Sequence, residues 1–89
     1  MQARDVCLRA ADLVAGDRAR QHGDAGRVHN HIAQLWATYL GTPITGHDVA
    51  LMMVLLKVAR ARNGVQNPDN YLDICGYGAI AGEIGASNA

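Results

Sequence analysis

Residues 44–77 read ITGHDVALMMVLLKVARARNGVQNPDNYLDICGY. The first part is apolar over the length of a helix, and Asn67 with Pro68 predicts the start of a second helix after a short turn. Two helices joined in this way pack as an antiparallel hairpin. Each of them carries charge, at Lys57 in the first and at Asp73 in the second. Because a buried charge must be paired or used, we expect a functional site within this hairpin.

Two more helices are predicted upstream of the hairpin. Apolar residues recur at helical spacing as far as Gly16, and again from Val28 to Tyr39 before Gly41 stops the helix. Between them, the segment at about 16–27 is rich in Gly and Arg and has no apolar periodicity, which predicts a loop. The fold expected is therefore all-α, a compact bundle of about four helices.

The hairpin itself has clear start and stop signals. Thr45 followed by Asp48 resembles a capping box, and Gly64 ends the helix that it begins. This helix is apolar nearly all round, so it is expected to be the central element. The glycines of the last helix, Gly76, Gly78 and Gly82, are expected where another helix, a second subunit or a ligand approaches closely.

The length and the net charge of the chain indicate what kind of protein it is. The 89 residues are expected to form one helical domain over 1–89, with a frayed tail at 85–89. Eight basic and eight acidic residues cancel, which argues against non-specific binding of nucleic acid and favours a homo-oligomer. The longest apolar run is too short to cross a membrane, and the two cysteines are expected to be buried free thiols. We therefore expect a cytoplasmic protein.

The antiparallel hairpin predicts which charges meet. Lys57 falls opposite Asp73, and Arg60 falls opposite Asn70 and close to Asp69. One interpretation is a structural ion-pair network between the two helices. Another is that Lys57 and Arg60 hold a phosphate or another anion while the aspartates orient them. A divalent metal on the two aspartates is a third, weaker interpretation, since it has only two carboxylates.

A second candidate site lies in the loop before the Trp-containing helix. Its Arg and His side chains could cover an anionic ligand, or it could be an ordinary solvated loop. Taken with the hairpin, the residues expected to bind ligand are Arg18, His22, Arg27, Lys57, Arg60, Asp69, Asn70, Asp73 and Tyr77. No nucleophile turn, P-loop, dinucleotide fingerprint or zinc spacing is present, so no catalytic residue, metal ligand or cofactor is assigned.

Several segments taken in order resemble a family of small phage and prophage proteins. They are DR at 17–18, HGD at 22–24, IAQLWATYLG at 32–41, ITGHDVALMMVLLKVAR at 44–60 and DNYLDICGYGA at 69–79. The family pattern has an Asp-Arg, a Tyr-Gly-Asp, a Trp helix, an Asp-Val-Ala-x-Met-Met helix and a closing Asp-Asn-Tyr-x-Asp-x-x-Gly-Tyr. Here His22 stands in place of the tyrosine. The resemblance implies a phage-encoded protein acting in the host cytoplasm.

The closing motif is also distantly similar to phage nucleotide-modification-associated domains and to all-α nucleotide pyrophosphohydrolases. Those hydrolases hold Mg²⁺ with a glutamate-rich set, whereas this chain has the single glutamate Glu83. An enzyme would therefore need Asp48, Asp69 and Asp73 as metal ligands.

Three functions follow from these patterns. The first is a helical module that binds a nucleotide or cyclic nucleotide without Mg²⁺, and so sequesters a host defence signal. The second is a Mg²⁺-dependent pyrophosphohydrolase-like enzyme. The third is a protein-binding inhibitor or assembly factor. The missing glutamates favour binding over catalysis.

Overall fold

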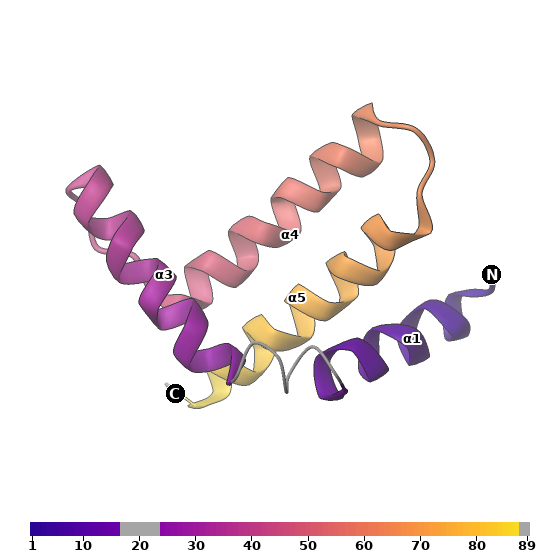
Figure 1. Ribbon diagram of the computed structural model, residues 1–89, viewed down its shortest axis with the longest axis horizontal. Helices are drawn as coiled ribbons and strands as arrows, with labels where there is room; N and C mark the ends of the chain where they lie inside the picture. The colour runs from indigo at the N-terminus through magenta and orange to yellow at the C-terminus, as the bar shows by residue number, and fades with distance from the viewer. Residues whose placement is uncertain (17–23, 88–89) are drawn as a thin grey trace.

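The computed structural model describes residues 1–16 and 24–87, and within them the fold is all-α. The helices are α1 (Ala3–Ala15), α3 (Ala25–Leu40), α4 (Gly46–Asn63) and α5 (Pro68–Ser87). As Figure 1 shows, α4 and α5 lie side by side and antiparallel, joined at one end by the 64–67 turn. This confirms the predicted hairpin. α1 packs along α5, and α3 packs mainly against α4.

Local caps explain why the helices begin and end where the sequence predicts. At the start of α4, the Asp48 N–H donates to Thr45 Oγ1 at 3.1 Å, and the Thr45 N–H donates to Asp48 Oδ2 at 2.9 Å. These two bonds form the predicted capping box. At the start of α5, the Asp69 N–H donates to Asn67 Oδ1 at 3.0 Å. Gly41 ends α3 in the left-handed conformation with φ 70°, which glycine adopts without strain.

Two helix ends differ from the expectation. α3 begins at Ala25, inside the predicted loop, because Asp24 caps it by accepting a hydrogen bond from the Gly26 N–H at 3.1 Å. α5 continues to Ser87, into the predicted tail. Near that end Ile84 is buried, and Gly85 lies so close to His47 that an added Cβ would stand 3.3 Å from His47 Cδ2. This packing holds the last turn of α5.

The core is thin and made mostly of small residues. Its buried apolar members are Ala10, Ala33, Val49, Ala50, Leu72, Ala81 and Ile84. Alanines let the helices approach closely but bury little apolar area each. The large side chains on the outer face of α4 lie exposed. α4, predicted to be the central element, packs against both α5 and α3, but the described residues leave its outer face uncovered.

The glycines of α5 do not share one role. A Cβ at Gly76 would stand 3.5 Å from Val14 Cγ1, so here α1 approaches as the sequence suggested. At Gly78 and Gly82 an added Cβ would meet nothing within 4 Å. The close approach expected on this helix is thus made by α1 at Gly76.

The two cysteines are free, as predicted, but they are not both buried. Cys7 on α1 is exposed and Cys75 on α5 is half-buried. Burial raises the pKa of the Cys75 thiol, and the neighbouring Cys7 raises it further. Because α1 packs along α5, residues far apart in sequence become neighbours.

The capping box at the start of α4 makes the stability of the fold depend on pH. The hydrogen bonds from Thr45, first from its backbone N–H, hold the pKa of Asp48 below its usual range. A depressed carboxylate pKa stabilises the fold above the pKa of an unfolded aspartate, and that contribution is lost as the pH falls through the lower folded value. We expect Asp48→Asn to reduce the acid-induced loss of stability below about pH 4. Urea unfolding of both proteins at pH 7 and pH 3 measures this, and an unchanged pH dependence would contradict it.

Candidate functional site

The charged pair predicted at the centre of the hairpin is present. Lys57 Nζ lies 2.9 Å from Asp73 Oδ2, and the two side chains are only 14% and 15% exposed. Lys57 comes from the apolar helix α4 and Asp73 from the facing side of α5, so the bond links the two helices in the half of the hairpin nearer the 64–67 turn. With its ammonium engaged in this way, Lys57 serves first as a structural partner of Asp73.

The second predicted pair does not form. Within the described residues there is no ion pair between Arg60 and Asp69, and both residues are exposed. Each is placed instead at a helix end: Arg60 in the last turn of α4 and Asp69 in the first turn of α5. There each charge is favoured by the helix dipole and needs no partner across the turn. Within the described residues, the predicted network thus keeps the Lys57–Asp73 bond and lacks the bond between Arg60 and Asp69.

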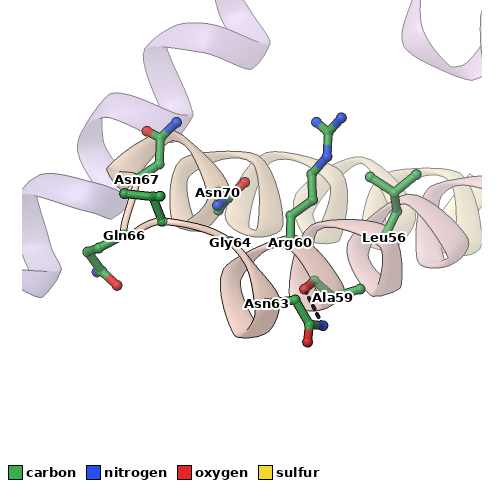
Figure 2. Close-up of a pocket in the computed structure, with 9 residues that line it drawn as sticks. Leu56, Ala59, Arg60, Asn63, Gly64, Gln66, Asn67 and Asn70 are labelled. Atoms are coloured by element: carbon green, nitrogen blue, oxygen red, sulfur yellow. Dashed lines mark hydrogen bonds between the residues drawn. The ribbon is translucent and has the colours of Figure 1, made fainter.

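Arg60 and Asn70 instead both line a pocket at the closed end of the hairpin, hereafter the hairpin-turn pocket (Figure 2). Its volume is about 850 Å³. The residues that line it are Leu56, Ala59, Arg60, Asn63, Gly64, Val65, Gln66, Asn67 and Asn70. In the view of Figure 2, Arg60 and Asn67 extend to one side of the hairpin, and Asn63 and Gln66 to the other.

Asn70 is the unusual member of this pocket. It is only 9% exposed, yet within residues 1–16 and 24–87 its side-chain amide makes no hydrogen bond. Among the described residues no side-chain nitrogen or oxygen is both fully buried and without a partner, so the Asn70 amide reaches the solvent-filled pocket, where water or a ligand can bond to it. The other amides are used or exposed: Asn63 Nδ2 donates to the Ala59 carbonyl at 2.9 Å, and Asn67 caps α5. Asn70 is thus the mostly covered member of the pocket whose amide is not used by the described residues.

Comparison with known proteins identifies the family. The model of a family described as a domain of unknown function, DUF6378, matches residues 5–85. The chain belongs to the DUF6378 family. It is also similar to the Gene 55 proteins of two mycobacteriophages. The chain is 42% identical to the Gene 55 protein of Mycobacterium phage L5 over 76 residues, which are 84% of this chain and 49% of the relative. With that of phage D29 it shares 32% identity over 82 residues, 92% of this chain and 54% of the relative.

These relatives confirm the expected membership in a family of small phage proteins. The DUF6378 chain spans about half the length of the two Gene 55 proteins. No solved structure matches it. In the part of the chain that the structure describes, no helix combines the length and the apolar character that crossing a membrane requires.

The remaining hairpin residues of the predicted site lie in a second pocket of the DUF6378 fold. Asp73 and Tyr77 line a space of about 560 Å³ between α1, α3 and α5. His29 of α3 joins them there: it is buried, its Nδ1 lies 2.7 Å from the Ala25 carbonyl oxygen, and its ring meets Tyr77 edge-on at 6.1 Å. His29 was not among the residues predicted for the site, although its spacing from Ala33 and Trp36 places it on the inner face of α3.

The loop residues of the predicted site do not join either pocket in what the structure describes. Arg27 is exposed on α3 and borders a separate shallow pocket with Asn30, His31 and Gln34. Arg18 and His22 lie outside the described residues. The site expected from the sequence is therefore divided, with Arg60 and Asn70 at the hairpin turn and Asp73 and Tyr77 between the helices.

Acidic residues are also dispersed in the described part of the DUF6378 chain. Within residues 1–16 and 24–87, no three His, Cys, Asp or Glu side chains stand close enough together to hold a metal ion. Of the three aspartates that an enzyme would need, Asp48 caps α4, Asp69 stands at the start of α5 and Asp73 binds Lys57. The described residues thus bring together no acidic set of the kind that pyrophosphohydrolases use.

Proposed function

We propose that this DUF6378 protein is a binding module for a nucleotide-type anion, either a nucleotide or a cyclic nucleotide, and that the hairpin-turn pocket is its site. The observation that carries the proposal is the mostly covered Asn70 side chain, whose amide makes no hydrogen bond within the described residues and lies in the same pocket as Arg60. A guanidinium supplies charge for a phosphate group, and an amide can both donate to and accept from the edge of a base. The pocket places these two functions on facing helices.

The start of α5 adds to the attraction for an anion. Asn67, the residue before this helix, lines the pocket, so the positive end of the helix dipole lies at its rim. None of these groups needs a metal to bind phosphate. A phage protein with such a pocket would hold a host nucleotide signal away from its receptor, which is a role in defence that requires capture and no catalysis.

Thermal shift with a panel of nucleotides and cyclic nucleotides, in the presence of EDTA, tests the proposal. At least one of them is expected to raise the Tm, and titration calorimetry then gives its Kd. Arg60→Gln and Asn70→Leu are each expected to weaken that ligand by about 10- to 100-fold, the effect of losing one hydrogen bond to a charged group. Leucine has the same branched shape and number of side-chain heavy atoms as asparagine, and it carries no polar group.

Arg4→Gln is the matched control, because Arg4 is exposed on α1 and lines neither pocket. It is expected to bind as the wild type does. The proposal is wrong if no nucleotide shifts the Tm of the wild type, or if Arg60→Gln and Asn70→Leu retain full affinity. A shift that requires Mg²⁺ and comes with hydrolysis would support the enzyme in its place.

A further inference from the structure

The outer face of α4 carries a continuous apolar stripe that none of residues 1–16 and 24–87 covers. It consists of Leu51, Met52, Leu55, Leu56 and Val58, whose exposed fractions run from 42% to 66%. These residues recur at spacings of three and four and so share one side of the helix. Figure 1 shows α4 at the edge of the fold, with α5 along one flank and α3 near its start. A contiguous apolar patch on a soluble protein marks an interaction site.

The exposed area indicates how large the missing contact is. The chain exposes 6351 Å². A compact monomer of this length would expose about 5,000 Å². The excess is larger than the roughly 800 Å² that each partner buries in a stable protein–protein interface. The radius of gyration, 13.6 Å, likewise exceeds the value of about 12 Å expected for 89 residues. The fold thus has enough uncovered surface for a full interface.

The charged residues at the two ends of the stripe indicate which molecule binds to it. Asp48 stands seven residues before Leu55, the most exposed member of the stripe, and Arg62 stands seven residues after it. If two copies of α4 pack antiparallel about a two-fold axis at Leu55, Asp48 of each copy faces Arg62 of the other. The same symmetry places Leu51 opposite Ala59, and Met52 opposite Val58. This stripe is self-complementary, as a two-fold interface requires.

Both charged groups are available for such a bond. Both residues are exposed, and the capping box occupies only Oδ2 of Asp48, which leaves Oδ1 for a guanidinium. The antiparallel arrangement also places the negative end of one helix dipole beside the positive end of the other. A net charge of zero adds no repulsion between two copies.

We infer that the outer face of α4 binds a second copy of this chain, forming a homodimer in which α4 packs antiparallel against α4 of the partner about a two-fold axis near Leu55. This goes beyond ligand binding at the hairpin-turn pocket, and either conclusion can fail without the other.

Sedimentation equilibrium of the wild type and of Leu55→Glu tests the dimer. The wild type is expected to have twice the monomer mass at micromolar concentrations, and Leu55→Glu the monomer mass with its helical circular dichroism retained. Val65→Glu is the matched control, since Val65 is 91% exposed but lies in the turn, away from the stripe. It is expected to stay dimeric. A monomeric wild type, or a dimer that survives Leu55→Glu, would overturn the inference.

Cysteine crosslinking tests the direction of pairing. In a background carrying Cys7→Ala and Cys75→Ala, Leu55→Cys is expected to form a disulfide-linked dimer on mild oxidation. Leu51→Cys and Ala59→Cys are each expected to stay unlinked alone and to link when mixed. Linking of Leu51→Cys to itself would show a parallel pair and would contradict the proposed axis.

The end charges are tested by a double-mutant cycle. Asp48→Asn keeps a side-chain oxygen for the capping box, so it removes the charge while the helix start is retained. Asp48→Asn and Arg62→Gln are each expected to raise the dimer Kd several-fold, and the double variant little further. Additive effects of the two changes would show that Asp48 and Arg62 do not meet.

Discussion

Lys57→Met is expected to lower the free energy of unfolding by about 3 kcal/mol, the typical loss when one partner of a buried ion pair is removed. The change leaves the Asp73 carboxylate, which is only 15% exposed, without the ammonium 2.9 Å away. Methionine keeps the length of the aliphatic stem, so packing is largely retained. For a domain of this size, the Tm is expected to fall by more than 10 °C.

Urea unfolding followed by circular dichroism measures the effect. Arg60→Met is the matched control: Arg60 lies one turn further along α4 and makes no ion pair with Asp69, so a change below about 0.5 kcal/mol is expected. Lys57→Met/Asp73→Asn should regain part of the loss, because the carboxylate charge that faced Lys57 is removed together with the ammonium. A Lys57→Met protein as stable as the wild type would show that the bond contributes nothing to stability.

Gly46→Ala is expected to destabilise the protein by about 1–2 kcal/mol, although alanine is the better helix former. Gly46 is the first residue of α4 and is buried against α3. A Cβ there would meet the Asn30 side-chain oxygen and would stand 3.1 Å from the Asn30 backbone nitrogen. The side chain can turn away, but the backbone of α3 cannot move without disturbing its contact with α4.

Gly82→Ala provides the comparison, since it makes the same change in a helix where a Cβ meets nothing within 4 Å. At Gly82 the change affects only helix propensity, so the free energy of unfolding is expected to rise by up to about 1 kcal/mol. Opposite signs for the two variants would confirm that α3 and α4 touch at Gly46. If Gly82→Ala were also destabilising, a second molecule would have to approach that face of α5.

The parts of the fold that could be predicted are those decided by local chemistry. Thr45 with Asp48 and Asn67 with Pro68 specify helix starts through bonds within three residues, so the hairpin and its register follow from sequence alone. That register in turn predicts the bond between Lys57 and Asp73, because residues equidistant from an antiparallel turn face each other.

The rest depends on how helices far apart in the chain pack. A helix that is apolar nearly all round has the same sequence pattern whether other helices cover one face or every face. The exposure of Leu55 could therefore not be predicted from the sequence. His29 meets Tyr77 only because α3 and α5 are brought together, and neither residue carries a local signal of the other. The Arg60–Asp69 pair was predicted wrongly because at the turn the helix dipoles satisfy both charges separately.

The packing of α1 against α5 has a consequence for the order of folding. α4 and α5 are consecutive, so their hairpin closes a short loop and is expected to form early, at the rates typical of helical proteins. α1 emerges from the ribosome before its partner α5 has been translated. Its apolar side therefore stays exposed to solvent until α5 is available to pack against it. Although α1 precedes α4 and α5 in the chain, it is therefore expected to dock after these two helices have formed their hairpin.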